Sequence, residues 1–239
     1  MKVTIVCEHN PSMDGEEGKS AYPEGMGNCI AGFMKKAGYE VTLVTYDDKG
    51  IDGLTDEILE NTEVMFWWGH WYHGAVPDAL ADRIVYRAQR GMGMVFLHSA
   101  HVSKPFKKLT GGTGSLKWRE DAEHERLWCV APAHPIAAGL GEYIDVPQEE
   151  MYGEPFDIPE PDELVYIGWF RGGEVLRGGC VFKRGRGKFF YFNPGHETYP
   201  TYRIPEVQQL LVQACKYVAP AEIIENFDCP NIPEYSLKF

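Results

Sequence analysis

The sequence predicts an α/β protein with a parallel sheet flanked by helices. Short apolar segments alternate with longer amphipathic segments through the first hundred residues, which is the order of strand and helix in a parallel sheet. Further strand-like segments follow in the C-terminal half, so extra β-strands are expected there. A hydrophobic content of 44%, with 13% aromatic residues, is enough for a packed core.

Four strands and three helices are expected in the N-terminal half. The strands are short and apolar or β-rich, as buried strands are, and comprise Val3–Cys7, Glu40–Tyr46, Val64–Trp68 and Met92–Leu97. The helices between them are Pro23–Ala37, Thr55–Asn61 and Pro77–Arg90. Gly38 stops the first helix, Thr55 caps the second, and Pro77 occupies the first position of the third.

The C-terminal half is less regular. Its expected strands are Glu125–Val130, Leu164–Trp169, Gly179–Phe182 and Gly187–Phe192, and its expected helix is Pro205–Val218. Leu109–Ser115 is rich in Gly and Thr, and Gln148–Pro161 is acidic and contains three prolines, so both are expected to be loops. We expect one domain over residues 1–218 and a tail, Ala219–Phe239, that packs on the domain or on a neighbouring subunit.

Composition excludes several partners and cofactors. The net charge of -12 argues against nucleic acid and anionic membrane, which both require clustered Lys and Arg. No apolar segment has the length of a secretory signal or a membrane span, and the six cysteines are widely spaced without a CxxC pair. A cytoplasmic protein with reduced thiols is therefore expected. No phosphate-binding loop occurs, so no nucleotide cofactor is expected.

Histidines directly follow three of the predicted strands. These polar residues are His70 and His73, His98 and His101, and His196 with Glu197. Loops after the strands of an open parallel sheet open onto one crevice, where ligands bind. The sequence therefore predicts one histidine-rich pocket. Glu8 and His9 end the first strand and should open onto the same crevice.

The residue types indicate roles in that pocket. His70, His73 and His101 are candidate ligands of a divalent metal such as zinc, because closely spaced imidazoles can share one ion. His98, His101, His196 and Glu197 are candidate catalytic acids and bases. The alternative is that these histidines are structural, tied into turns or facing solvent.

Aromatic residues beside the histidines favour a sugar ligand. Trp68, Trp71, Tyr72 and Tyr199 are candidate substrate-binding residues, since aromatic rings stack on pyranose faces, and Glu154 could supply a carboxylate. The alternative for the first three is an aromatic edge of the core. Glu149, Glu150 and Glu154 lie in the segment expected to be an acidic, solvated loop.

The turn at His98 also raises a hydrolase hypothesis. A strand-to-helix turn can expose a nucleophile at the top of a sheet, and Ser99 is the one hydroxyl in this turn. The flanking G-x-S-x-G pattern is absent, so a site that uses His98 or His101 is favoured over a serine hydrolase.

Four motifs together resemble the ThuA-like, trehalose-utilisation proteins. They are Trp67–His70, Leu97–His101, His134–Ile136 and Phe192–Tyr199. The resemblance implies a flavodoxin-like fold similar to that of the class I glutamine amidotransferases. Those enzymes carry a Cys at the turn that His98 and Ser99 occupy here, so glutamine amidotransferase activity is not expected.

The resemblance implies a role in the catabolism of trehalose or a related disaccharide through keto-sugar intermediates. A 3-keto sugar has acidic protons beside its carbonyl, so an isomerase, a lyase or a hydrolase could use a metal and a His or Glu base. The alternative is a non-catalytic sugar-binding or regulatory module of the same fold. The aromatic-rich segments and the partly apolar tail also predict a homo-oligomer.

Overall fold

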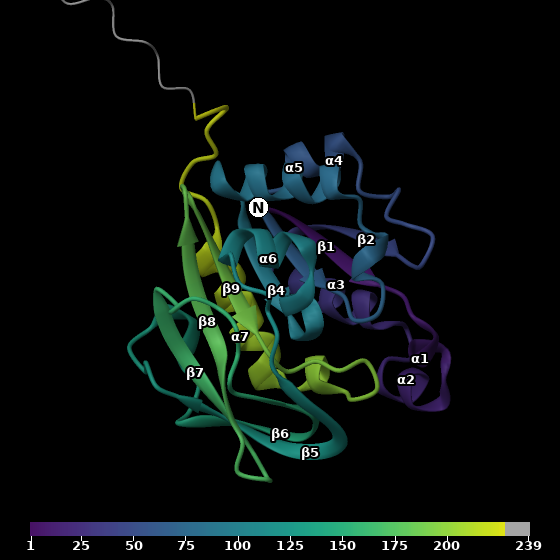
Figure 1. The fold of residues 1–239 in the computed structure, drawn as a ribbon, viewed down its shortest axis with the longest axis vertical. Coiled ribbons are helices and arrows are strands. Elements are labelled where there is room, and N and C mark those ends of the chain that lie inside the picture. Colours follow the sequence, from purple (N-terminus) through teal and green to yellow (C-terminus); the bar gives the residue numbers. More distant parts are fainter. Residues whose placement is uncertain (228–239) are drawn as a thin grey trace, which may run out of the picture.

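The computed structural model describes residues 1–227. Within these residues, nine strands form one sheet in the order β2-β1-β3-β4-β9-β8-β7-β5-β6 (Figure 1). The neighbours from β2 to β9 pair parallel to one another, whereas β8 pairs antiparallel with both β9 and β7, and β5 pairs antiparallel with both β7 and β6. The sheet therefore has a parallel half and an antiparallel extension.

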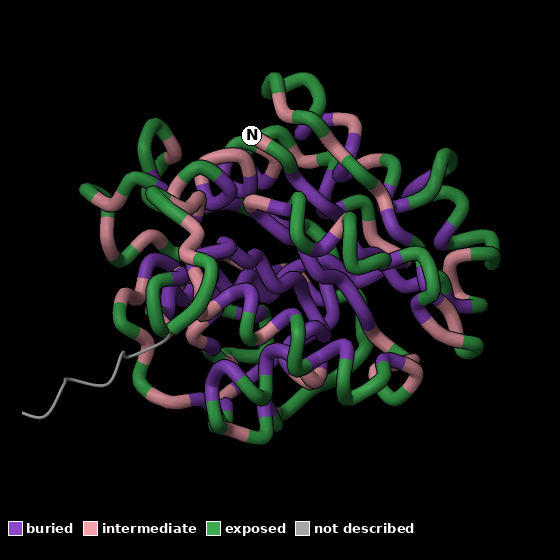
Figure 2. Tube along the Cα trace, turned by 90° about the horizontal axis from the view of Figure 1, so that it is seen from above, coloured by how far each residue is buried: buried purple, intermediate pink, exposed green. Residues whose placement is uncertain are grey.

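The parallel half is covered by helices on both faces. Its strands are β1 (Lys2–Glu8), β2 (Glu40–Tyr46), β3 (Val64–Trp68), β4 (Gly93–Leu97) and β9 (Gly187–Phe192). One apolar core lies under α3 (Met26–Lys36) and α7 (Pro205–Val218), and the other under α4 (Asp56–Asn61), α5 (Asp78–Gln89) and α6 (Lys104–Thr110). Every residue of β3 and β4 is buried, which explains why their sequences are continuously apolar. Figure 2 shows buried residues gathered in the middle of the molecule and exposed ones around it.

The antiparallel extension has one face towards the core and one towards solvent. It comprises β8 (Val175–Arg184), β7 (Glu163–Phe170), β5 (Lys117–Cys129) and β6 (Tyr143–Gly153). Along β5, Leu127 is buried and Trp128 is exposed, as alternation in a half-solvated sheet requires. Its strands mix polar and aromatic residues, so they are harder to recognise as strands from the sequence than the apolar strands of the parallel half.

The structure corrects the prediction for the segment Gln148–Pro161. Residues 148–153 are not a loop but the second half of β6, and Glu149 and Glu150 are buried instead of solvated. The error arose because carboxylates are buried only when hydrogen-bond donors or charges pair with them, and the pairing groups here are far away in sequence. The strand expected to start at Glu125 also begins earlier, at Lys117.

Short helices were the other elements that the sequence did not indicate. They are α1 (Pro11–Asp14), α2 (Glu16–Ala21) and α6, whose last two residues lie in the segment expected to be a loop. Residues 1–227 also contain four 3-10 turns: η1 (His73–Ala75), η2 (His98–Val102), η3 (Pro135–Ala137) and η4 (Thr201–Arg203). Elements this short have too few residues for a periodic apolar pattern.

The described part of the tail, residues 219–227, packs on its own domain. The amide of Ile224 donates to the Arg90 carbonyl (3.1 Å), and the ring of Phe227 lies 6.0 Å from that of Tyr86. Residues 228–239 of the predicted tail lie outside the described residues. In the part of the chain that is described, the five cysteines are free, and no helix is long and apolar enough to cross a membrane.

Candidate functional site

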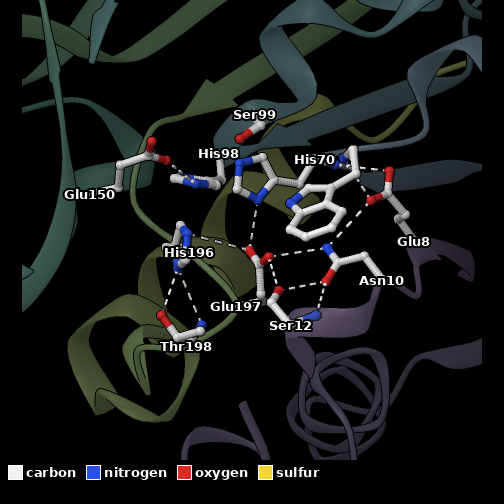
Figure 3. Close-up of polar contacts among 12 residues, drawn as sticks. Glu8, Asn10, Ser12, His70, His98, Ser99, Glu150, His196, Glu197 and Thr198 are labelled. Carbon is white, nitrogen blue, oxygen red and sulfur yellow. Dashed lines mark hydrogen bonds and ion pairs between the residues drawn. The ribbon is translucent and has the colours of Figure 1, made fainter. Parts of the chain in front are cut away.

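The site lies at the carboxyl ends of the parallel strands, where the strand order reverses. The chain passes from β1 to its neighbour β2 on one side, and then to β3 on the other side of β1. The loops after β1 and β3 therefore diverge and leave a crevice, which is where open α/β sheets bind ligands. Figure 3 shows that side chains from β1, β3, β4, β6 and β9, or from the loops that follow them, converge there.

The buried Glu8 at the end of β1 fixes the loop after β3. Its carboxylate accepts hydrogen bonds from the amides of His70 (3.0 Å), Trp71 (2.7 Å) and Tyr72 (2.9 Å). These three donors would otherwise be unpaired at a buried strand end. Glu8 thus sets the position of His70 without reaching into the pocket itself.

His70 and Glu197 form an imidazole–carboxylate pair. Nδ1 of His70 lies 2.8 Å from Oε2 of Glu197, which is only 1% exposed and also accepts from Asn10 (3.1 Å) and from the hydroxyl of Ser12. Burial alone would raise the pKa of Glu197, but the His70 contact and the charges of His70 and His196 outweigh it and hold that pKa well below its usual range. Glu197 is therefore ionised, and it orients His70 with Nδ1–H towards itself and Nε2 free.

His98 occupies the sharp turn between β4 and η2. Its φ of 51° is in the left-handed region, which few residues other than glycine adopt. Nδ1 donates to the Asn193 carbonyl (2.9 Å), and Nε2 forms an ion pair with Glu150 (3.1 Å). Burial would lower the pKa of His98, but the Glu150 contact and the charges of Glu149 and Glu150 raise it to about 9. With both nitrogens engaged, His98 is a buried cation and not a free base.

His196 presents the opposite tautomer. Its Nδ1 accepts a hydrogen bond from the Thr198 amide (3.3 Å) and lies 2.8 Å from the Thr198 hydroxyl. Burial lowers the pKa of His196, so the ring is neutral and its proton is on Nε2. That Nε2 lies 3.6 Å from Oε2 of Glu120 and 3.8 Å from Oε2 of Glu197.

The three imidazoles form a compact triangle. Ring centroids are 5.6 Å apart for His70 and His98, 5.2 Å for His70 and His196, and 5.6 Å for His98 and His196. Four of the six predicted strand-end residues, these histidines and Glu197, are thus brought together.

His73 and His101 lie apart from this triangle's donor atoms. Nδ1 of His101 donates to the Gly114 carbonyl (2.6 Å), its ring packs edge-on against Tyr152, and burial lowers its pKa to about 3. Neither ring nitrogen of His73 has a hydrogen-bond partner in the described residues, and burial lowers its pKa to about 4. Three clusters of possible metal-ligating atoms occur in the described residues, and none of them contains His73 or His101. The three predicted metal ligands, His70, His73 and His101, are therefore not brought together.

Strand β6 contributes Tyr152, which the sequence did not single out, and Glu149 and Glu150, which were expected in a solvated acidic loop. Glu149 accepts hydrogen bonds from the amides of Gly195 (2.7 Å) and His196 (2.9 Å) and from the Thr201 hydroxyl (2.9 Å), so it fixes the loop after β9. Tyr152 stacks on His98 with centroids 4.8 Å apart. The cross-strand position of these groups depends on sheet pairing, which local sequence patterns do not encode.

A pocket of about 290 Å³ opens beside the triangle. It is lined by imidazoles, hydroxyls, a carboxylate and an exposed indole: His70, His101, Ser99, Tyr152, Glu150 and Trp118. Its volume is near the lower end of small-molecule sites (roughly 300–1,000 Å³), and its mixture of polar groups and one aromatic face is typical of a site for a small polar ligand.

The predicted substrate-binding residues have different positions. Trp68 is fully buried and its indole donates to the Gly195 carbonyl (2.9 Å), whereas Trp71 is exposed and Tyr72 is half-buried. Tyr199 donates its hydroxyl hydrogen to Glu120 at the rim of the site. Glu154 is engaged by the Arg177 guanidinium (2.8 and 3.1 Å), away from the histidine triangle.

Ser99 lacks the partner that a serine nucleophile requires. Its hydroxyl lies 2.6 Å from the Tyr152 hydroxyl, and no hydrogen bond joins it to a histidine in the described residues. The geometry of a nucleophile activated by an adjacent base is therefore missing from this part of the chain.

The central sheet flanked by helices, with the site at its strand ends, defines a flavodoxin-like fold similar to that of the class I glutamine amidotransferases. A glutamine amidotransferase from Thermotoga maritima superposes with a TM-score of 0.53 at 11% identity, over 90% of this chain and 97% of that one. A likeness at such low identity establishes the fold alone.

The chain belongs to the ThuA family, described as trehalose utilisation, which it matches over residues 12–218. A ThuA-like protein from Parabacteroides merdae superposes with a TM-score of 0.67 at 14% identity, over 95% of this chain and 92% of that one. A Salmonella typhimurium protein described as cytoplasmic gives 0.61 at 13% identity, over 92% and 100%. The comparison with curated proteins gave no match. Family membership supports a carbohydrate-related role.

Proposed function

We propose that this protein is a cytoplasmic enzyme of disaccharide catabolism that removes a proton beside the carbonyl of a keto-sugar. The family description, trehalose utilisation, supports a sugar substrate. The pocket beside His70, with its hydroxyls and its indole, supports a ligand of that size and polarity. No glutamine amidotransferase activity is expected, because His98 occupies the turn of the cysteine nucleophile.

The observation that carries this proposal is the pair formed by His70 and Glu197. A buried carboxylate 2.8 Å from Nδ1 fixes the tautomer of His70 and stabilises the imidazolium that forms when Nε2 accepts a proton. His70 also lines the pocket, so a bound sugar can reach it. Nε2–H of His196, in the same triangle, would donate a hydrogen bond to the oxygen on which negative charge develops.

Turnover of keto-sugars tests the proposal. The purified protein is incubated with 3-keto-trehalose and 3-keto-glucose, and the sugars are followed by NMR. We expect conversion by the parent protein and about a 10³-fold slower reaction for His70→Gln. His124→Ala, which removes an imidazole on the outer part of β5, is the matched control and should react normally. Binding of either sugar without conversion would favour the non-catalytic module instead.

A metal-dependent reaction at the same residues is the second candidate. His70, His98 and Glu150 have ligand atoms within 4.8 Å of one another. Nδ1 of each histidine is engaged outside this cluster, by Glu197 and by the Asn193 carbonyl, so an ion would bind through Nε2. Nε2 of His98 would have to lose its proton and its ion pair with Glu150 to do so. His196 fits less well, because its Nδ1 accepts a hydrogen bond. A divalent metal held by this set would polarise the sugar carbonyl.

Metal content separates the two candidates. The protein is purified without a histidine tag, soaked with Zn²⁺ or Mn²⁺, desalted and measured by mass spectrometry beside His98→Ala and the control His124→Ala. Near-stoichiometric metal that is lost only in His98→Ala would support the metal-dependent reaction. Parent protein that converts keto-sugar without bound metal would leave His70 as the base.

A further inference from the structure

We propose that Glu120 is the proton donor to the departing oxygen of a keto-glycoside, so that the reaction is an elimination that cleaves the glycosidic bond. This inference rests on the proposed function and adds a second catalytic residue, a direction of reaction and a substrate class. It follows from the shape of β5 at residues 119–123, which neither the family description nor the strand-end histidines involve.

A β-bulge directs Glu120 towards the site. In the pairing of β5 with β6, Arg119 stands opposite Met151 and Glu123 opposite Glu149, so residues 120–122 all stand opposite Glu150 alone. Ala122 has a φ of 46°, a strained value for a residue with a side chain. Bulges beside active sites commonly redirect a side chain.

The two ends of the bulge are anchored. The Arg119 guanidinium donates to Glu123 (2.6 Å) and to Glu174 (3.0 Å), and Glu123 also accepts from the Gly172 amide (3.3 Å). The strain at Ala122 is therefore maintained by several contacts outside the pocket. A local distortion with this much support is expected to serve a function.

Glu120 lies beside His196 of the histidine triangle, and its side chain is partly exposed. One of its carboxyl oxygens accepts from Tyr199, the other lies 3.6 Å from His196, and ligand atoms of Glu120, Glu150 and His196 lie within 4.8 Å of one another. Trp118, two residues earlier on the strand, is 67% exposed and lines the pocket. An exposed indole beside Glu120 provides a surface on which the departing sugar can stack.

The environments of Glu120 and Glu150 shift the pKa values of their carboxyl groups in opposite directions. Burial raises the pKa of Glu120, with a contribution from the negative charge of Glu150, against the hydrogen bond from Tyr199. Glu150 is held ionised by the cationic His98, which outweighs the effect of burial on its pKa. A proton donor must be kept neutral, and a neighbouring ionised carboxylate favours that state. Because the Glu120 side chain is 36% exposed, water can return its proton after each turnover.

The step balances without a co-reactant. Nε2 of His70 takes the proton from C2 of a 3-keto-glycoside, and the C–H electron pair becomes the C1=C2 double bond. The C1–O bond breaks, its electron pair stays on the departing oxygen, and the Glu120 carboxyl gives that oxygen a proton. The products are an unsaturated keto-sugar and a free alcohol or sugar, and solvent returns the protons to their starting positions.

Leaving-group dependence tests the inference. The probes are the 3-keto derivatives of methyl glucoside and 4-nitrophenyl glucoside, because methoxide requires protonation to depart and 4-nitrophenolate does not. For Glu120→Gln we expect the methyl probe to react about 100-fold slower and the nitrophenyl probe less than about 5-fold slower. Glu120→Asp should recover part of the loss, and Asp121→Asn, which removes the neighbouring exposed carboxylate, should react like the parent.

Each other outcome contradicts the inference in a distinguishable way. An equal loss for both probes in Glu120→Gln would assign the residue to folding or binding, and no loss would remove it from the reaction. Exchange of the C2 proton by the parent without cleavage of either probe would overturn the elimination and leave the proposed function standing. Neither exchange nor cleavage by the parent would overturn both.

Discussion

The parallel half and the antiparallel extension contribute to one site in different ways. The parallel half supplies histidines from short, tightly anchored loops, and His70 is fixed by the carboxylates of Glu8 and Glu197. The extension supplies Glu149 and Glu150 from the edge strand β6, whose neighbour β5 is bulged. Under the proposed function, the α/β scaffold would provide the base, whereas the extension would provide acidic groups and the surface on which a substrate rests.

The base on the parallel half should show the largest effect. His70→Gln should lower kcat on a keto-sugar by about 10³-fold, because it removes the proton acceptor. Glu197→Gln should lower it by roughly 10²-fold, since an amide neither fixes the tautomer nor stabilises the imidazolium. Steady-state kinetics checks both, and equal activity of Glu197→Gln and the parent would mean that the pair has no catalytic role.

The contact between the two halves should control stability. Glu149→Ala removes the acceptor of two buried amides, at Gly195 and His196, so we expect a loss of about 3 kcal/mol in the free energy of unfolding. Urea denaturation of the variant beside Glu160→Ala, a change at an exposed position, measures this loss. A loss below about 0.5 kcal/mol would show that the loop after β9 is fixed without β6.

Trp118, which the extension contributes to the pocket, should affect substrate binding more than the rate of the chemical step. Trp118→Ala removes an exposed indole at the pocket, so KM should rise about tenfold, equivalent to ~1.4 kcal/mol, with kcat nearly unchanged. Trp128→Ala, on the outer face of the same strand, is the matched control. If both variants raised KM alike, the pocket would not extend to Trp118.

A second contact between the halves should give the smallest effect, one that is present at neutral pH and disappears in acid. Glu163 of β7 accepts from His134 (2.6 Å) and from Tyr217 of α7 (2.7 Å), and pairs with Lys183 (2.7 Å). Burial would raise its pKa, but these contacts lower it from 4.5 to about 2. The carboxylate therefore stabilises the fold above pH 4.5, and this contribution is lost as the pH falls through about 2.

Glu163→Gln should accordingly lose about 1 kcal/mol at neutral pH and unfold with less dependence on pH between 4.5 and 2. Unfolding midpoints in urea at several pH values measure the difference from the parent. An unchanged pH dependence would mean that other carboxylates dominate acid unfolding.

The same contrast explains what could be predicted from the sequence. The strands of the parallel half are buried on both faces, so the sequence shows them as apolar runs. The histidines that follow these runs and the family motifs could be recognised from the sequence as well. Glu150 was named only as part of an acidic segment expected to be solvated, because the groups that pair with a buried carboxylate cannot be identified from local sequence. Glu120 was not named, because a bulge depends on the pairing of two strands. A partial signal for Trp118 and Glu120 is their spacing of two, which places both on one face of a strand.

The most direct test of the account is deuterium exchange at C2 of methyl 3-keto-glucoside in D₂O, followed by NMR. We expect the parent protein and Glu120→Gln to exchange this proton rapidly, because the base on the parallel half acts before the acid on the extension. His70→Gln should exchange it about 10³-fold more slowly. Exchange at the parent rate by His70→Gln, or neither exchange nor cleavage of this substrate by the parent, would contradict the account.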